Sequence, residues 1–299
     1  MADAGAPLQK NTYAGYLQLD KLLAAQVPRT GSEDELLFII MHQSHELWFK
    51  LAIHELEHAA KALMQGVSGK DCLMAYKRLE RVREIQNLLI HSWEVLTTLT
   101  PDEFFLFRET VGKDGASGFQ SVQYRVLEFS LGLKYRALTM RTPKGPISIS
   151  IFDTAPARQD RTTLEAALAA PSIYDAAIDF MARTAFPKIA LRHDYVSQYR
   201  RSDAVFAAWR QVYEDRHEAP ELYQLGEKLV DLEDAFRRWR FAHLATVSRV
   251  IGINPGTGGS SGLQYLQAAA NQLIETPLYP ELWEVRDAMF SRGRPSETR

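Results

Sequence analysis

The stretch EDELLFIIMHQSHELWFKLAIHELEHAAKALM, residues 33–64, decides the fold of this chain. It holds no glycine or proline, and its apolar residues recur at the three- and four-residue spacing of one helix face. Ser32 is a suitable N-cap for such a helix, and Gly66 lies just past its end. The sequence therefore predicts one long amphipathic helix near the start of the chain.

Helical periodicity dominates the rest of the sequence as well. N-cap residues, prolines at first helical positions and glycines after the last periodic residue mark where the remaining helices begin and end. The expected helices are residues 70–99, 101–111, 117–133, 160–169, 172–186, 202–216, 219–251, 263–275 and 279–290.

One segment departs from this pattern. Residues 146–152, PISISIF, alternate with period two as a half-buried strand does, and no second strand is evident to pair with it. We therefore expect an all-α fold, with a single mostly helical domain over residues 1–299. Its less regular parts are an N-terminal arm (1–20), an irregular insertion near 136–160 and a polar tail (291–299).

Composition narrows the classes of function. The formal net charge is −2, which argues against a nucleic-acid or membrane-surface partner. The N-terminal stretch lacks the apolar core of a signal peptide, and no apolar run approaches the length that spans a bilayer. The single cysteine, Cys72, excludes an intramolecular disulfide and a multi-cysteine metal site, and suits a reducing compartment. We expect a soluble, cytoplasmic protein.

Inside the first long helix, residues 54–58, HELEH, match the H-E-x-x-H pattern of zinc hydrolases. That spacing places His54 and His58 one turn apart, with Glu55 as the general base. Zinc also needs a third ligand, and residues 77 and 78, where one is expected, are basic. The two histidines also continue a stripe of leucines, so they are explained equally well as bordering the buried face. A zinc hydrolase is the weaker alternative.

Six other stretches are more informative, because they occur together in one order. They are YAGYL (13–17), FIIMHQSHELW (38–48), LTPDEFFLFR (99–108), SGFQSVQYR (117–125), WRFAH (239–243) and GTGGSSG (256–262). In this order and at these separations the chain resembles the tryptophan 2,3-dioxygenase family. Any one of these motifs is weak, and six in register are specific. The resemblance covers residues 13–133 and 219–290.

The resemblance implies a haem-dependent dioxygenase with one haem b per subunit, whose iron is Fe(II) in the active form. It implies that O₂ adds across the indole C2–C3 bond of L-tryptophan to give N-formyl-L-kynurenine. This reaction is the first step of tryptophan degradation by the kynurenine route. It also implies a homotetramer, arranged as a dimer of dimers.

The resemblance also assigns the residues that hold the haem. His243 lies in a helical run that is otherwise apolar on one face, where a lone histidine is more often a core residue. In the family this position is the proximal ligand of the haem iron. Neutral imidazole is the usual axial ligand where iron must bind O₂ on its other face. Ser117 and Gly118 resemble the family's turn beside the haem, although the sequence alone makes them a helix N-cap.

The substrate pocket is expected on the first long helix. Phe38 and His42 are four residues apart and so lie on one side of it. The resemblance places both in the pocket, together with Ile39, Ile40 and Met41, and makes His42 the catalytic residue. There His42 accepts a hydrogen bond from the indole N–H, a group that can only donate. Orienting the substrate is its main expected contribution.

Arg108 is the expected partner of the substrate carboxylate. It follows Phe104 by four residues, so both share one face of a short helix, and Phe105 and Phe107 predict that this helix is buried. A guanidinium fork suits bidentate capture of a carboxylate. Some family members carry tyrosine where this chain has Phe104, so that hydroxyl is absent. In the family, Thr257 contacts the substrate's ammonium and carboxylate groups from a glycine-rich loop that closes over the pocket.

The N-terminal arm is too short to have a core of its own, and alone it would be judged frayed. Its large apolar residues Tyr13, Tyr16 and Leu17 gain a purpose from the resemblance. In the family this arm crosses to a neighbouring subunit and completes its substrate pocket.

Two further alternatives stay open on the sequence. One is a haem-binding sensor without turnover, and the other is a related dioxygenase that acts on other indoles. Arg108 and Thr257 favour an amino-acid substrate. His45 has no role that the resemblance supplies, and His54 and His58 lie outside the family's catalytic set.

Overall fold

The computed structural model describes residues 12–113, 118–142, 145–153, 155, 157–252 and 262–291. Helices dominate these residues, together with one short 3₁₀ turn and one two-stranded sheet. The predicted all-α class is therefore confirmed. Within the described residues, no helix is long and apolar enough to cross a membrane.

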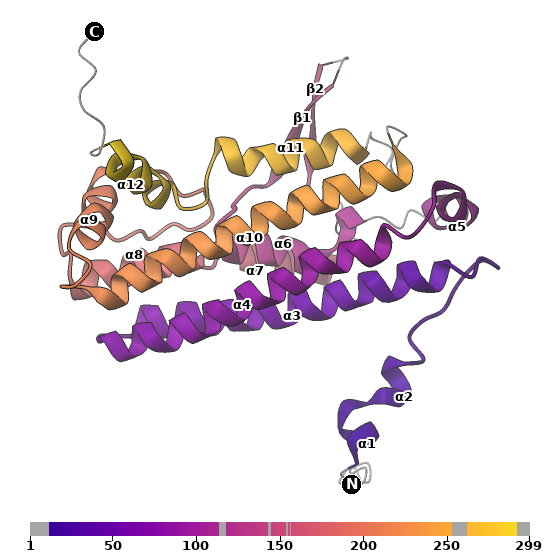
Figure 1. Ribbon diagram of the computed structural model, residues 1–299, viewed down its shortest axis with the longest axis horizontal. Helices are drawn as coiled ribbons and strands as arrows, with labels where there is room; N and C mark the ends of the chain where they lie inside the picture. The colour runs from indigo at the N-terminus through magenta and orange to yellow at the C-terminus, as the bar shows by residue number, and fades with distance from the viewer. Residues whose placement is uncertain are drawn as a thin grey trace.

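Three long helices form the body of the molecule. They are α3 (Glu35–Gln65), α4 (Gly69–Leu96) and α10 (Pro220–Ile251). Helix α4 packs against both of the others, and the three run along the long axis of the molecule in Figure 1. The N-terminal end of α3 and the C-terminal ends of α4 and α10 meet at one end of this body, beside α5.

Shorter elements cover the long helices. Helices α6 and α8 pack on α3, α7 packs on α6, α11 packs on α10, and α9 packs on α12. Their bounds, with those of the two arm helices and the 3₁₀ turn η1, are α1 (Tyr13–Leu17), α2 (Leu19–Leu22), α5 (Pro101–Lys113), η1 (Gly118–Gln120), α6 (Val122–Leu131), α7 (Arg158–Ala169), α8 (Ile173–Thr184), α9 (Asp203–Glu214), α11 (Gly262–Glu275) and α12 (Pro280–Ser291).

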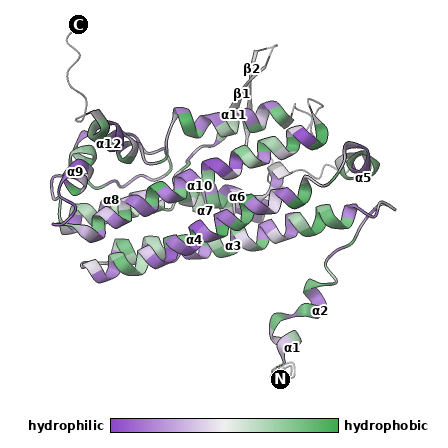
Figure 2. Cartoon of the chain, in the orientation of Figure 1, coloured by the Kyte–Doolittle hydropathy of each residue, from purple (hydrophilic) through white to green (hydrophobic). Residues whose placement is uncertain are grey.

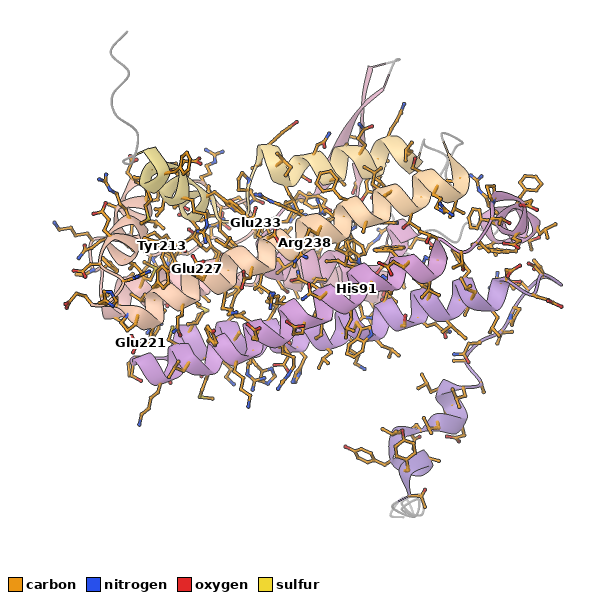
Figure 3. All side chains as sticks on the ribbon, viewed as in Figure 1. His91, Tyr213, Glu221, Glu227, Glu233 and Arg238 are labelled. Carbon is orange, nitrogen blue, oxygen red and sulfur yellow. The ribbon has the colours of Figure 1, made fainter. Side chains whose placement is uncertain are left out.

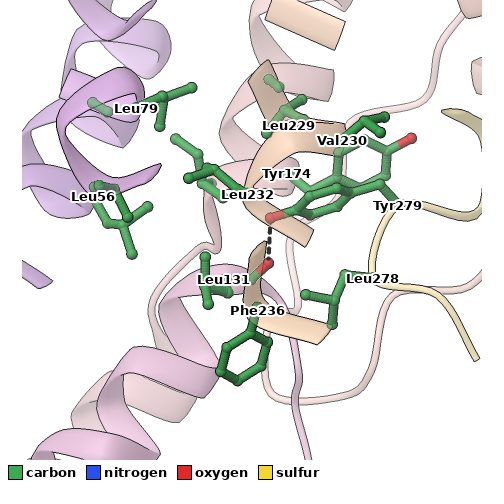
Figure 4. Packing of buried hydrophobic residues seen from close by; sticks show 14 of the residues in the cluster. Leu56, Leu79, Leu131, Tyr174, Leu229, Val230, Leu232, Phe236, Leu278 and Tyr279 are labelled. Atoms are coloured by element: carbon green, nitrogen blue, oxygen red, sulfur yellow. Dashed lines mark hydrogen bonds between the residues drawn. The ribbon is translucent and has the colours of Figure 1, made fainter. Parts of the chain in front are cut away.

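The core lies where the faces of these helices meet. Apolar and polar residues alternate around each long helix, as the green and purple bands of Figure 2 show. In Figure 4, Leu56 and Leu79 face Leu232 and Leu131, and the Tyr279 hydroxyl donates to the Leu131 carbonyl at 3.0 Å. All five side chains are almost fully buried. Each buried leucine contributes about 2 kcal/mol by leaving water.

Buried Glu233 on α10 fastens the C-terminal part of the chain to this core (Figure 3). Its carboxylate accepts the backbone N–H groups of Leu278 at 3.0 Å and Tyr279 at 3.1 Å. It also accepts the indole N–H of Trp283 at 2.9 Å and pairs with Arg237. A buried carboxylate with this many donors fixes where the chain crosses α10 before α12 begins.

The first long helix begins later than predicted. Its N-cap is Asp34, so the prediction that Ser32 caps it is wrong. The physical reason is Glu35, whose carboxylate accepts the backbone N–H groups of residues 29–30 at 2.9 and 2.8 Å and so orders the preceding loop. The predicted end is confirmed, because Gly66 is the C-cap.

The stretch predicted as one helix over residues 117–133 is divided. The turn η1 comes first, and the α-helix begins only after Ser121, whose hydroxyl accepts the backbone N–H of Tyr124 at 3.1 Å. The predicted start at Ser117 lies outside the described residues. The end is as predicted, since Gly132 follows the last turn with a φ of 115°, which glycine adopts at little cost.

The insertion near 136–160 contains a hairpin. Strand β1 (Ala137–Thr142) pairs antiparallel with β2 (Gly145–Ser150), and the pair projects from the helical body in Figure 1. The expectation that residues 146–152 have no partner strand is therefore wrong. The partner was missed because in ALTMRT only two large apolar residues, Leu138 and Met140, show the alternating pattern of a strand, which is too short a pattern to identify one.

Residues 12–20, the part of the N-terminal arm that the structure describes, lie outside the helical body. Helices α1 and α2 contact each other and extend away from the long helices in Figure 1. The side chains of Tyr13 and Tyr16 are 78% and 80% exposed. The arm is tied to α3 where Gln26 donates to the Gln43 side chain at 2.6 Å and Gln43 donates to the Ala25 carbonyl at 3.0 Å.

Candidate active site

The first wall of the site is one face of α3. The rings of Phe38 and His42 lie 4.1 Å apart, because four residues make about one turn. The Nδ1 of His42 is 2.8 Å from the Phe38 carbonyl oxygen. A carbonyl can only accept, so Nδ1 carries the proton and Nε2 keeps a free lone pair. Burial lowers the pKa of His42, against weaker opposing effects of the Phe38 carbonyl and of Glu46. At neutral pH His42 is therefore a hydrogen-bond acceptor at Nε2.

The second wall comes from α5. Pro101 occupies its first position, and Glu103 accepts the Thr100 backbone N–H at 2.8 Å, which fixes the helix start. The ring of Phe104 lies 5.9 Å and that of Phe107 5.5 Å from the Phe38 ring. Helix α5 therefore supplies an aromatic surface opposite α3.

Arg108 stands at the edge of this aromatic surface. Its guanidinium carbon is 5.9 Å from the centre of the Phe104 ring, and the side chain is half-buried. It makes no hydrogen bond or ion pair to any residue that the structure describes. The prediction of a buried helix is half right, because Phe107 is buried while Phe105 is 58% exposed. A half-buried guanidinium without an anion suits capture of a carboxylate.

The third wall is the C-terminal part of α10. The His243 ring stacks on Trp93 of α4, with ring centres 4.4 Å apart and planes within 7°, and lies 5.4 Å from Trp239. Burial, and then the charges of His42, His45 and Arg240, lower the pKa of His243 to about 3. Its imidazole is therefore neutral at physiological pH. It has no hydrogen bond to the described part of the chain.

These residues fit a haem. Among the described residues, no group of three His, Cys, Asp or Glu side chains could hold a bare metal ion. One neutral imidazole would be enough to hold the iron of a haem, because the porphyrin itself supplies the other ligands. The indole Nε1 atoms of Trp93 and Trp239 are buried beside His243 and lack a hydrogen-bond partner among the described residues. A Cβ added to Gly118 would meet no atom of the described residues within 4 Å.

The zinc alternative is not favoured. The side chains of His54 and His58 are exposed, so the suggestion that they border the buried face is wrong. Glu55 is buried on the other side of α3, where it binds Arg78 at 3.0 Å and Arg81 at 2.6 Å. Burial acts to raise the pKa of Glu55, but the two arginines hold it below its usual range. A carboxylate bound in this way is no general base.

The structure places the remaining candidates differently. Ile39 is half-buried, Ile40 is 49% exposed and Met41 is buried in the core, because consecutive helical residues point in different directions. Gly118 begins η1. Ser117 and Thr257 lie outside the described residues.

The three arm residues are exposed and do not join the site of their own chain. Tyr13, Tyr16 and Leu17 lie on α1, which extends away from the helical body (Figure 1).

His45 is a residue whose position the sequence did not reveal. It is buried, its Nδ1 lies 3.0 Å from the Met41 carbonyl oxygen, and its Nε2 lies 3.3 Å from the Ser92 hydroxyl. Its ring is 4.8 Å from Trp93, which also stacks on His243. The spacing of three residues places His45 on the same side of α3 as His42, and only packing shows that it contacts Trp93.

A buried charge cluster lies behind the third wall. Glu128 on α6 binds Arg125 at 2.8 Å, and also binds Arg240 of α10 and the Tyr135 hydroxyl. Arg125 in turn donates to the Tyr265 hydroxyl at 2.8 Å. All of these groups except Tyr135 are nearly inaccessible to solvent. The signal in the sequence was charged residues on the apolar faces of two predicted helices.

Comparison with known proteins agrees with this geometry. A family model described as tryptophan 2,3-dioxygenase matches residues 4–289. The chain is 46% identical to the tryptophan 2,3-dioxygenase of Pseudomonas fluorescens over 93% of its own length and 91% of the relative's. It is 46% identical to that of a Bradyrhizobium species (93% and 92%) and 44% identical to that of Bacillus cereus (92% and 91%). Matches of this extent show that the chain belongs to the tryptophan 2,3-dioxygenase family.

Proposed function

We propose that this protein is an oxidoreductase that incorporates both atoms of O₂ into L-tryptophan and forms N-formyl-L-kynurenine. Family membership supports the reaction. The choice of substrate rests on two groups of the site. His42 Nε2 is a neutral acceptor that matches the indole N–H. Arg108 is a cation without an anion among the described residues, and it matches the carboxylate of a free amino acid.

Haem b would be held by His243 as its protein ligand, with Ser117 and Gly118 at its edge. When bound, the haem supplies the activation of O₂ that protein side chains cannot supply. The protein contributes a neutral imidazole, because a protonated one could not donate a lone pair to iron. Burial keeps His243 in that form.

The protein's own residues orient the substrate. Arg108 binds the carboxylate with two parallel N–H groups, and Thr257 contacts the ammonium and carboxylate groups. The rings of Phe38 and Phe104 pack against the indole and exclude water, and buried Phe107 supports them from behind. Ile39, Ile40 and Met41, which lie between Phe38 and His42 on α3, belong to the same proposed substrate-binding stretch. Holding the reacting bond in place in this way lowers the entropic part of the activation barrier and so raises the rate.

His42 acts by accepting a hydrogen bond rather than by removing a proton. Its Nδ1–H stays on the Phe38 carbonyl while Nε2 accepts from the indole N–H. A lowered pKa makes this imidazole a weak base, and indole N–H is a poor acid. Both facts favour orientation of the ring as the role of His42.

A homotetramer, arranged as a dimer of dimers, belongs to the same proposal. The arm residues Tyr13, Tyr16 and Leu17 are 78%, 80% and 41% exposed, which is unusual for large apolar side chains on one short segment. Packing against the substrate pocket of a neighbouring subunit would bury them.

The test is a visible spectrum of the reduced, haem-supplemented protein before and after L-tryptophan, followed by assay for N-formylkynurenine. We expect a Soret band that L-tryptophan shifts, and product that incorporates two atoms of ¹⁸O from ¹⁸O₂. Tryptamine, which lacks the carboxylate, is the matched control and should bind weakly. Haem binding without product would make the protein a sensor, and absence of a haem band after reconstitution would overturn the proposal.

A further inference from the structure

Glu46 lies on α3 one turn beyond His42, and it connects α3 to the start of α6. One carboxylate oxygen accepts the hydroxyl of Ser121 at 2.6 Å, and the other accepts the side-chain N–H of Gln123 at 2.8 Å. The same Gln123 amide donates to the Glu46 backbone carbonyl at 3.0 Å. Three hydrogen bonds thus join one residue of α3 to two residues separated from it by more than 70 positions in the sequence.

Ser121 connects Glu46 to the turn that holds Gly118, one of the candidate site residues. Its hydroxyl donates to Glu46 and accepts the backbone N–H of Tyr124, so it fixes both the start of α6 and the end of the turn η1. The backbone N–H of Ser121 also donates to the Gly118 carbonyl at 3.2 Å. The Tyr124 ring lies 5.2 Å from Trp239, which packs on His243.

We propose that Glu46 is a positioning residue that holds the Gly118–Gln120 turn and the start of α6 against the His42 helix. The inference rests on the proposed function, in which this turn borders the haem. Glu46 touches neither substrate nor haem, and acts through Ser121 and Gln123.

A carboxylate is required because both of its oxygens receive a donor. A glutamine at position 46 has one oxygen and one NH₂ group, so only one of the two carboxylate acceptors remains. If its NH₂ group faces Gln123, two donors meet. If it faces Ser121, the hydroxyl must accept instead of donating to a charged group. Hydrogen bonds to a charged acceptor are also about twice as strong as those to a neutral one.

Glu55 provides a matched control on the same helix. Its carboxylate also receives two donors from a neighbouring helix, Arg78 and Arg81 of α4, and it is buried. It faces away from the site residues. Glu55→Gln therefore removes a comparable connection between helices and leaves the turn η1 untouched.

The experiment compares the wild-type holoenzyme with Glu46→Gln, Glu55→Gln, Ser121→Ala and the Glu46→Gln/Ser121→Ala double variant. We expect both glutamine variants to lower the melting temperature. Only Glu46→Gln and Ser121→Ala should lower kcat, by about tenfold, since small misplacements of reacting groups cost rates of this order or more. The dissociation constant of L-tryptophan should stay within about twofold of wild type, since Arg108 and His42 are unchanged. The double variant should lower kcat by less than the product of the two single effects, because both changes break the hydrogen bond between Ser121 and Glu46.

A second measurement does not depend on turnover. Amide hydrogen exchange at residues 118–124 should accelerate in Glu46→Gln and stay unchanged in Glu55→Gln. If Glu46→Gln matches Glu55→Gln in kcat and in exchange at the turn, Glu46 has only a general structural role and the inference is overturned. A wild-type protein without product would instead overturn the proposed function, and the exchange comparison would still decide whether Glu46 holds the turn.

Discussion

At the scale of single residues, the site depends on side chains whose protonation and partners are set by burial. His42 and His243 stay neutral because burial removes the water that would solvate a charged imidazole. Arg108 has no anionic partner among the residues described. The site therefore offers a lone pair and a cation at one end of the bundle, which is the complement of an indole amino acid.

Replacing Arg108 by alanine should weaken L-tryptophan binding roughly 10- to 100-fold, because hydrogen bonds to charged groups contribute ~1.5–3 kcal/mol. The equilibrium dissociation constant, from the substrate-induced spectral shift, measures this. Affinity for tryptamine should hardly change, since it has no carboxylate to lose. Arg108→Lys should recover only part of the affinity, because an ammonium group lacks the planar fork. Full affinity in the alanine variant would remove Arg108 from its proposed role.

His45 should make the haem-free protein sensitive to acid. Burial lowers the pKa of His45 to about 4, against the Met41 carbonyl, so below the ordinary value near 6.5 the unfolded chain binds a proton that the folded chain does not. Stability is then present above pH 6.5 and is lost as the pH falls toward 4, by up to about 3 kcal/mol. Urea unfolding as a function of pH measures this. His45→Gln should reduce the dependence, and the part that remains comes from the other two histidines whose pKa is lowered by burial, His42 and His243.

The control for His45 is His91 on α4 (Figure 3). Its Nδ1 makes the same contact with the carbonyl one turn earlier, at 2.8 Å, but its side chain is exposed. His91→Gln should leave the pH dependence of stability as it is in the wild type. Equal effects of the two substitutions would show that burial of His45 is not the cause.

At the scale of elements, periodicity was sufficient for the long helices and insufficient for their contacts. Residues 219–251 were predicted as a helix, and α10 spans Pro220–Ile251. The stacking of His243 on Trp93 could not be predicted in this way, because it joins α10 to α4 through packing rather than local pattern. The same holds for the division of residues 117–133, where a contact with α3 fixes the start of α6.

The tie between α6 and α10 gives a prediction at this scale. Glu128→Gln leaves Arg125 and Arg240 buried with no compensating charge between them. Breaking a buried ion pair from one side typically costs ~3–5 kcal/mol, so we expect a large loss of unfolding free energy. The matched control is Glu84→Gln on α4, which removes an exposed pair with Arg83 and should cost at most ~1 kcal/mol. Chemical denaturation measures both, and a mild effect of Glu128→Gln would show that the cluster relaxes or admits water.

At the scale of the whole molecule, one chain supplies the site residues of α3, α5 and α10, while helices α1 and α2 extend away from the helical body. The all-α class followed from sequence patterns, while the identity of the site followed from six motifs in register. The fold of one chain brings the N-terminal end of α3 and the C-terminal ends of α4 and α10 together beside α5 (Figure 1). These helices include α3 with Phe38 and His42, α5 with Arg108, and α10 with His243. The fold of one chain does not explain the exposed apolar residues of α1, whereas the proposed assembly would bury them.

Mixing two inactive variants tests whether the arm completes a neighbour's pocket. One variant lacks residues 1–20 and keeps an intact site, and the other keeps the arm and carries Arg108→Ala. Each should be poorly active alone. If the arm acts across subunits, unfolding and refolding them together should restore activity, because arms of the second variant can reach intact pockets of the first. Mixing without exchange of subunits is the control, and light scattering reports the assembly. Mixed assemblies that form and stay inactive would show that the arm serves only its own chain, since then no subunit has both an arm and Arg108.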